Sequence, residues 1–227
     1  MSHDDHACRL LQLASPALPV GAYSYSQGLE WGIESGAVID AATARQWISD
    51  HLSLVFARFE APVYAASFRA WADIDADTIQ RLNADFIASR ESSEPRAETI
   101  QVGFSYAAWC REVAPISERQ REVLSSLSSP CAPVAASLAS CASGLSVRAG
   151  LLAYVFGFAE NQVMVLAKAL PLGQIASQKL LFSLGDAVAA CVEHAIELSE
   201  DDWSSASPLL AIAQMKHETQ YSRLFRS

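Results

Sequence analysis

Apolar side chains recur at intervals of three and four residues along most of the chain, which is the spacing of amphipathic α-helices. The clearest stripe follows Asp40, a predicted N-cap, and consists of Ile48, Leu52, Val55, Phe59 and Val63. We expect one helix there, with a possible kink at Pro62. A later stripe from Leu180 to Ile196 predicts another helix. No alternating pattern of useful length predicts a β-strand.

Capping residues and prolines mark further boundaries. Ser117 opens a capping-box pattern, and Ser146 precedes the most apolar run of the chain. The sequence Ser93-Glu94-Pro95 predicts a break between helices, the sequence Pro171-Leu172-Gly173 predicts a turn, and Pro208 starts a last helix. We therefore expect one all-α domain over residues 1–227, a bundle of eight to ten helices with two projecting ends. Residues 1–9 are expected to be disordered.

The stretch from Gly150 to Leu170 is apolar and nearly long enough to cross a bilayer. Glu160, Asn161 and Gln162 lie at its middle, however, where hydrocarbon would disfavour each by several kcal/mol, and Lys168 adds to that penalty. We interpret the stretch as a helix buried in a soluble bundle.

Composition supports a folded protein and excludes some functions. Of 227 residues 51% are hydrophobic and 18% charged, which favours extensive burial over disorder. The chain has 16 Lys and Arg against 25 Asp and Glu, for a net charge of -9, so nucleic-acid binding is not expected.

The five cysteines, Cys8, Cys110, Cys131, Cys141 and Cys191, contain no C-x-x-C pair. Their odd number and scattered positions suit free thiols in a reducing compartment. The polar start Met-Ser-His-Asp-Asp-His resembles neither a secretory signal nor a transit peptide. We expect a cytoplasmic protein.

Residues 15–30, which we call the signature segment, read Ser-Pro-Ala-Leu-Pro-Val-Gly-Ala-Tyr-Ser-Tyr-Ser-Gln-Gly-Leu-Glu. Pro16 and Pro19 favour extended backbone, while Gly21 and Gly28 permit conformations that other residues resist. A specified backbone that displays hydroxyls and aromatic rings suggests a recognition surface. A structural loop that packs over a helical core is the alternative.

Catalytic motifs are weak. The chain lacks a P-loop sequence and a nucleophile elbow. Ser24 or Ser26 could act as a nucleophile only if a distant histidine reached it. At the N-terminus, His3, Asp4, Asp5, His6 and Cys8 could together hold a soft divalent ion such as nickel, although we favour the simpler interpretation of a disordered polar terminus.

The last residues, Met-Lys-His-Glu-Thr-Gln-Tyr-Ser-Arg-Leu-Phe-Arg-Ser, form what we call the C-terminal motif, residues 215–227. Arginines and aromatic residues on a short basic stretch are typical of protein interfaces. We therefore expect this motif to dock on a partner, through a set of seven residues. The set is His217, Glu218, Tyr221, Arg223, Leu224, Phe225 and Arg226.

Three stretches together resemble the urease accessory protein F family (UreF): the signature segment, Val163 to Gln174, and the C-terminal motif. They occur in the same order as in that family and span most of the chain. The residues that we assign to a family-signature surface are Ser15, Pro16, Pro19, Gly21, Tyr23, Ser24, Tyr25, Gly28, Glu30, Pro171, Gly173 and Gln174. Tyr23 and Gln27 stand where the family more often has Phe and His.

The resemblance implies a non-enzymatic, cytoplasmic, dimeric factor in nickel delivery. Such proteins bind a UreD- or UreH-like accessory protein and recruit the GTPase UreG to apo-urease. Nickel and GTP would be handled by the partners, and this chain would have no cofactor, metal site or catalytic residue of its own. Arg148, Arg223 and Arg226 are candidates to stimulate the partner's GTP hydrolysis. A helical small-ligand-binding or hydrolytic protein that uses the Ser24 region is the alternative.

Overall fold

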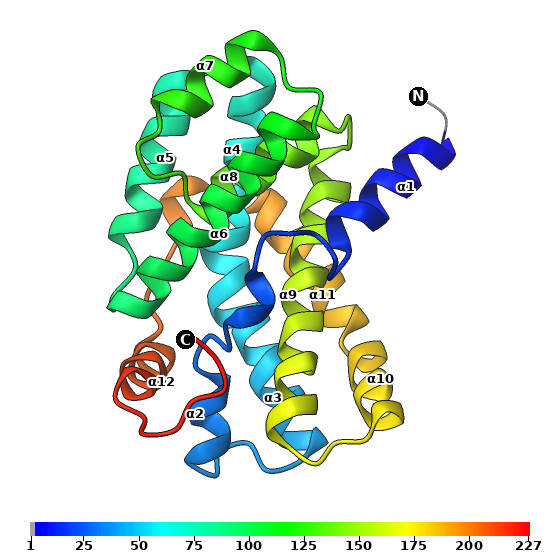
Figure 1. Ribbon diagram of the computed structural model, residues 1–227, viewed down its shortest axis with the longest axis vertical. Coiled ribbons are helices and arrows are strands. Elements are labelled where there is room, and N and C mark those ends of the chain that lie inside the picture. The colour runs from blue at the N-terminus through cyan, green and yellow to red at the C-terminus, as the bar shows by residue number, and fades with distance from the viewer. Residues whose placement is uncertain (1–2) are drawn as a thin grey trace.

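In a computed structural model of the protein, residues 3–227 are described as helices joined by short loops, without a strand among them, which confirms the all-α prediction. Figure 1 shows an elongated assembly in which the long helix α9 (Val147–Ala169) runs through the middle. Before it come α1 (His3–Ala14), α2 (Leu29–Glu34), α3 (Ala41–Asp50), α4 (Glu60–Asp73), α5 (Ala76–Ala88), α6 (Ser93–Glu112), α7 (Glu118–Ser126) and α8 (Ala132–Ala142). After it come α10 (Gln174–Ser183), α11 (Gly185–Glu197) and α12 (Pro208–Glu218). Short 3₁₀ turns lie at Ala22–Ser24, Phe56–Arg58 and Glu200–Asp202.

The predicted caps are present. Asp40 accepts the Thr43 N–H and forms a capping box with it, Ser117 does the same with Gln120, and Ser146 accepts the Ala149 N–H. Pro208 is the first residue of α12. These single residues therefore located four helix starts in the sequence.

The stripe after Asp40 does not form one continuous helix. It is interrupted by a π-helical turn, His51–Val55, and by the 3₁₀ turn, Phe56–Arg58, before α4 begins. Pro62 is the third residue of α4, where a missing N–H costs little, so it does not kink a helix. The Leu180 to Ile196 stripe is likewise divided, at Leu184. These divisions raise the number of helices above the eight to ten expected.

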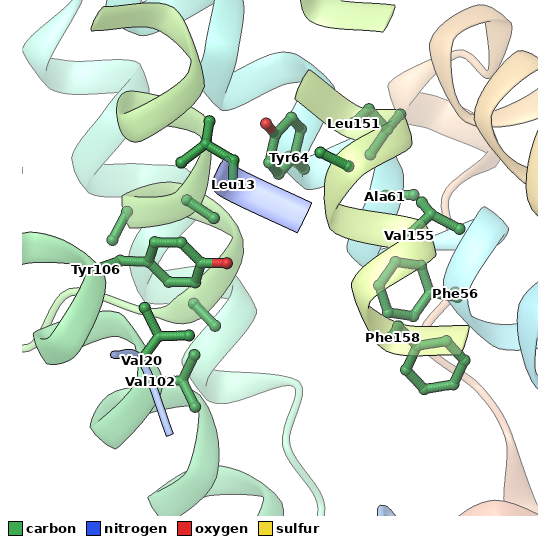
Figure 2. Close-up of a cluster of buried hydrophobic side chains, with 14 of the residues drawn as sticks. Leu13, Val20, Phe56, Ala61, Tyr64, Val102, Tyr106, Leu151, Val155 and Phe158 are labelled. Atoms are coloured by element: carbon green, nitrogen blue, oxygen red, sulfur yellow. The ribbon is translucent and has the colours of Figure 1, made fainter. Parts of the chain in front are cut away.

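The core is built around α8, every residue of which from Ala132 to Ser140 is buried. Helix α8 packs on α4 and α6, and the Trp71 indole N–H donates to the Val134 carbonyl at 2.9 Å. On α6, a Cβ at Gly103 would come within 2.0 Å of the Pro130 carbonyl oxygen, so only glycine permits this approach. Figure 2 shows a neighbouring part of the core, in which Phe56 and Phe158 pack with ring centroids 4.9 Å apart.

The N-terminal residues differ from expectation. Helix α1 includes most of the residues expected to be disordered, and residues 1–2 lie outside the described part. Its inward side chain Leu13 is buried, Leu10 packs against the core, and α1 contacts α9. Burial of these leucines accounts for the order of the helix.

Two helical stretches are apolar and long enough to cross a bilayer by length and composition, Val147–Ala169 and Gln174–Glu197. The first is α9, which is mostly buried inside the bundle and contacts α1, α4, α8, α10 and α11. Its position agrees with the interpretation of a core helix.

Candidate functional site

The signature segment and the C-terminal motif meet in space. In Figure 1 the chain leaves α12, turns, and returns along α2 and the segment before it. The Ser26 N–H donates to the Ser227 carbonyl oxygen at 2.7 Å, and the Arg226 N–H donates to the Ser24 carbonyl oxygen at 2.9 Å. The Ser26 hydroxyl also donates to the Ser227 carbonyl oxygen. Two of the three stretches that carry the family resemblance therefore form one structure.

Glu30 is the centre of that structure and is only 6% exposed. One of its carboxylate oxygens accepts the Leu224 N–H at 2.6 Å, and the other accepts the Phe225 N–H at 3.1 Å. The second oxygen also lies 3.0 Å from Nε2 of His217. A buried carboxylate that accepts two successive backbone N–H groups is well satisfied, so Glu30 fixes the backbone of the returning chain.

His217 is fully buried between two carboxylates. Its Nδ1 lies 2.8 Å from Glu94, and the other oxygen of Glu94 accepts a hydrogen bond from Arg223. Glu30, His217, Glu94 and Arg223 thus form a continuous chain of contacting polar side chains from α2 through α12 and α6 to the residues after α12.

Glu218 caps helix α6. Its carboxylate accepts the Ser93 hydroxyl and the Glu94 N–H, each at 2.9 Å. The Glu94 N–H also holds the pKa of Glu218 below its ordinary value. The predicted break at Ser93-Glu94-Pro95 is therefore the first turn of α6, with its cap supplied from α12.

Glu98, one turn further along α6, binds both ends of the site. It accepts the Gln27 side-chain amide at 2.6 Å and the Ser227 hydroxyl at 2.9 Å. Burial raises the pKa of Glu98 to about 7, while these two hydrogen bonds partly oppose that rise.

The polar residues at the middle of α9 anchor the signature segment. The Tyr23 hydroxyl donates to Glu160 at 2.8 Å, Asn161 donates to the Tyr25 carbonyl at 2.9 Å, and Gln162 donates to the Ser26 carbonyl at 3.3 Å. Burial and the Glu160 contact raise the pKa of Tyr23 above its ordinary range. The residues that argue against a membrane span thus have a structural role.

Glycines of the signature segment lie where the backbone requires them. Gly21 and Gly28 have φ of 76° and 85°. A Cβ at Gly28 would come within 3.3 Å of Ala213, so this glycine also permits the approach of α12. Pro16 and Pro19 are exposed, and Ser15 accepts the Ala17 N–H at 3.2 Å.

The seven predicted partner-binding residues separate into two groups. His217 and Phe225 are buried, Glu218 is partly buried, and Arg223 is paired with Glu94. Tyr221, Leu224 and Arg226 point outward, and Leu224 is 67% exposed. The first group holds the chain in place, whereas the second is displayed to solvent.

The Pro171 to Gln174 turn follows the C-terminal end of α9. Pro171, Gly173 and Gln174 are exposed, and α10 contacts α3, α9 and α11. The nearest link to the C-terminal motif is Lys168, whose ammonium lies 5.3 Å from the centre of the Phe225 ring. The turn is thus near the site but is not part of its hydrogen-bond network.

The structure describes no base positioned to activate Ser24. The contribution of Ser24 to the site is its carbonyl oxygen, which accepts the Arg226 N–H, and Ser26 is buried. Nor do the described residues include a group of three or more His, Cys, Asp or Glu that could hold a metal ion. Of the terminal candidates, Cys8 is exposed, and the side chain of His3 lies outside the described part.

A cavity of about 130 Å³ lies behind the signature segment. Tyr23, Gln27 and Glu98 line it on the side of the site, together with Val20, which Figure 2 shows beside Val102. Elsewhere it is lined by Glu60, whose carboxylate accepts the Tyr154 hydroxyl at 2.7 Å and lies 3.7 Å from Arg90. Burial raises the pKa of Glu60. This volume is large enough for several water molecules or a small polar ligand.

Sequence reasoning missed the acidic half of the site. Glu94 and Glu98 stand one helical turn apart on α6, so they share a face, and Glu160 is the third missed acid. Charge complementarity could have indicated these residues in the sequence. A locally basic C-terminal motif on an acidic protein favours pairing with acidic side chains of the same chain.

Comparison with known proteins gives a consistent result. A family model described as UreF matches residues 38–185. The urease accessory protein UreF of Azoarcus sp. (strain BH72) is 52% identical over 221 residues, covering 96% of this chain and 94% of the relative. The proteins of the same name from Dechloromonas aromatica (strain RCB) and Methylobacillus flagellatus are 47% and 43% identical, with coverage of 96% or more of each chain. The resemblance seen in the sequence is confirmed, and the chain belongs to the UreF family.

Proposed function

We propose that this chain is a urease maturation factor that binds a UreD- or UreH-like protein, recruits the GTPase UreG, and couples its GTP hydrolysis to nickel insertion into apo-urease. Family membership supports the general part of this proposal, because the relatives are named urease accessory proteins and the family is non-catalytic. In this proposal nickel and GTP are handled by the partner proteins.

The assignment of the docking surface rests on one observation: exposed apolar residues lie on a stretch of backbone that is fixed by buried side chains. Tyr221 is fully exposed and Leu224 is 67% exposed, although Phe225 beside them is buried and the backbone is tied to Glu30. Aromatic residues and Arg dominate interface energetics, and a preordered display lowers the entropic cost of binding.

Helix α12 displays further apolar side chains. Leu209, Ile212 and Met215 are 82%, 48% and 54% exposed and follow one another at intervals of three residues. Together with Tyr221 and Leu224 they form what we call the C-terminal apolar surface. We assign this surface to the UreD- or UreH-like partner, because apolar exposure of this kind marks protein interfaces.

Among the three candidate arginines, Arg226 is exposed, and its side chain is in no ion pair of the described part of the chain. Arg148 pairs with Glu193, and Arg223 pairs with Glu94. An arginine that acts on GTP of a partner must be able to leave its own protein, so Arg226 is the best candidate. The Arg226→Ala variant should slow partner GTP hydrolysis; equal turnover in all three single Arg→Ala variants would exclude the role.

Our proposal further includes a cytoplasmic homodimer that binds neither nucleic acid nor membrane. The net charge of -9 and the absence of a basic stripe in the sequence support the exclusion of nucleic acid. Light scattering of the purified chain measures the oligomeric state directly.

Co-expression with a UreD-like protein tests the docking surface. We expect the full chain to form a stable complex, and the double variant Tyr221→Ala/Leu224→Ala to lose it while its helical content is unchanged. Leu11→Ala is the matched control, because Leu11 is 66% exposed on α1 at a distance from α12. Retention of the complex by the double variant would refute the assignment.

The cavity of about 130 Å³ is the observation that favours the alternative, a small-ligand-binding protein. That alternative predicts that the isolated chain binds a small polar molecule with a measurable thermal shift, and that a bulky substitution such as Val102→Phe abolishes the shift. Partner capture without any such ligand would favour the assembly role.

A further inference from the structure

The cavity behind the signature segment contains a buried hydroxyl group that has no partner. Tyr106 lines this cavity and is 8% exposed, and its hydroxyl forms no hydrogen bond with the described residues. Two other tyrosines that line the cavity differ, since Tyr23 donates to Glu160 and Tyr154 donates to Glu60. Figure 2 shows the Tyr106 hydroxyl directed toward the middle of the cluster of buried side chains. Because buried polar groups are normally paired, this hydroxyl points to a polar atom of a bound molecule.

Acidic side chains outnumber basic ones on the cavity wall. Glu60, Glu98 and the exposed Glu91 line it, and Arg90 is the one arginine or lysine among the described lining residues. His51 also lines the cavity but is uncharged near neutral pH, because burial lowers its pKa to about 3. The Arg90 guanidinium lies 3.7 Å from Glu60, so it compensates that carboxylate in part and leaves the charge of Glu98 unbalanced. A cation inside the cavity would supply the missing positive charge.

The rest of the wall is largely aromatic. Phe56 and Phe158 both line the cavity, with ring centroids 4.9 Å apart. Aromatic faces attract organic cations, whereas a metal ion requires several oxygen, nitrogen or sulfur ligands at short distance. The volume of about 130 Å³ is close to that of an engineered apolar cavity of about 150 Å³ that binds benzene. The cavity therefore suits a cation with a short alkyl chain.

We propose that this cavity binds a small organic ammonium ion. An N–H group of the ligand donates to the Tyr106 hydroxyl oxygen, and Glu60 balances the positive charge. The alkyl part of the ligand packs against Phe56 and Phe158.

This ligand goes beyond the assembly role and is compatible with it. Leu210 and Gln214 of α12 line the cavity, whereas Leu209, Ile212 and Met215 of the same helix are exposed. The ligand and a protein partner would thus contact different faces of α12. Failure of ligand binding would leave the result of the co-expression test unaffected.

NMR titration of the full chain with three compounds of similar size tests the proposal. The compounds are n-butylammonium, 1-butanol and propionate, which carry a positive, no and a negative charge. We expect n-butylammonium to shift the amide resonances of Ala153 and Gly157, which lie on the cavity wall of α9, with a Kd on the order of a millimolar. The other two compounds should bind at least about tenfold more weakly.

Two substitutions test the assigned contacts. Tyr106→Phe keeps the ring and removes the hydroxyl, so n-butylammonium should bind at least about fivefold more weakly. Tyr64→Phe is the matched control and should leave the affinity unchanged, because the buried Tyr64 hydroxyl donates to Ser140 at 2.6 Å and does not line this cavity. Glu60→Gln keeps an acceptor for Tyr154 and should reduce the preference for n-butylammonium over 1-butanol to less than about threefold.

Equal or tighter binding of 1-butanol or propionate would overturn the assignment of an ammonium ligand. Absence of shifts at Ala153 and Gly157 with all three compounds would overturn the proposal, and the cavity would then hold water alone. Undiminished binding of n-butylammonium by both Tyr106→Phe and Glu60→Gln would place its site elsewhere and would also overturn the proposal.

Discussion

Ser26 and Ser227 are 201 residues apart in the sequence, yet the Ser26 N–H donates to the Ser227 carbonyl oxygen at 2.7 Å. This contact joins the signature segment to the C-terminal motif. Because Asn161 and Gln162 of α9 hold the neighbouring carbonyls of Tyr25 and Ser26, the C-terminal motif is aligned against the central helix through that segment. The conformations of the two motifs therefore depend on each other.

Glu30→Ala should destabilise the protein strongly. Its removal leaves the buried Phe225 N–H and the part-buried Leu224 N–H without their acceptor and takes away the buried contact with His217, at a cost of about 3–5 kcal/mol. Denaturant unfolding measures the loss. Glu34→Ala, an exposed glutamate on the same helix, is the matched control and should change stability by less than about 0.5 kcal/mol. Equal effects of the two substitutions would contradict the assigned role of Glu30.

Phe225→Ala and Leu224→Ala should have opposite consequences. Phe225 is 7% exposed and lies beneath Lys168, so its truncation should cost about 3 kcal/mol of stability. Leu224 is 67% exposed, so its truncation should leave stability nearly unchanged while it weakens partner capture. Thermal unfolding and co-purification, performed on both variants, distinguish the two roles. If Leu224→Ala proved the more destabilising, Phe225 would not be the residue that holds the chain in place, and the division into buried and displayed residues would be incorrect.

Gly103→Ala should prevent normal packing of α6 on α8. The added Cβ would meet the Pro130 carbonyl oxygen at 2.0 Å, which only a backbone shift can relieve. We expect a loss of several kcal/mol. Gly157→Ala is the control, since nothing lies within 4 Å of its Cβ position in the middle of α9. That substitution should stabilise the protein by about 0.5–1 kcal/mol, measured as a shift in denaturation midpoint. Similar effects at both glycines would contradict the close approach.

His51 should contribute to acid denaturation. Burial lowers the pKa of His51 to about 3, and its Nδ1 has no hydrogen-bond partner among the described residues. Because the native pKa lies below the ordinary 6.5, its neutral form stabilises the fold above pH 6.5, and that contribution is lost as the pH falls towards 3. His51→Leu should flatten stability against pH in this range, by up to about 1.4 kcal/mol per pH unit. Denaturant titrations from pH 7 to pH 4 measure the unfolding free energy of both proteins. If it fell equally with pH in His51→Leu and in the unsubstituted chain, the contribution of His51 would be excluded.

The parts of the fold that local chemistry determines were predictable. Capping residues such as Asp40, Ser117 and Ser146 act within one helical turn, so single residues located those helix starts. The interruption between α3 and α4 was not predictable, because the stripe of apolar residues continues through it. Ile48 and Val63 are buried on either side of the π-helical turn and Leu52 is buried within it, so packing permits the change of helix type without a change in pattern.

The candidate site was predictable in part. Both motifs were found from the sequence, and the displayed residues Tyr221 and Leu224 lie among those expected to bind a partner. The docking of His217 on Glu30 and Glu94 depends on three elements far apart in the chain, and no local pattern encodes such a contact. Order in α1 was missed for the same reason, since Leu13 is stabilised by contacts with distant helices.

The polar middle of α9 has a consequence for substitutions at Glu160, Asn161 and Gln162. Replacing any of these side chains by an apolar one would lower the free energy of transferring α9 into hydrocarbon, and it would remove one anchor of the signature segment. The same three positions therefore set both the hydropathy of the helix and the placement of the signature segment.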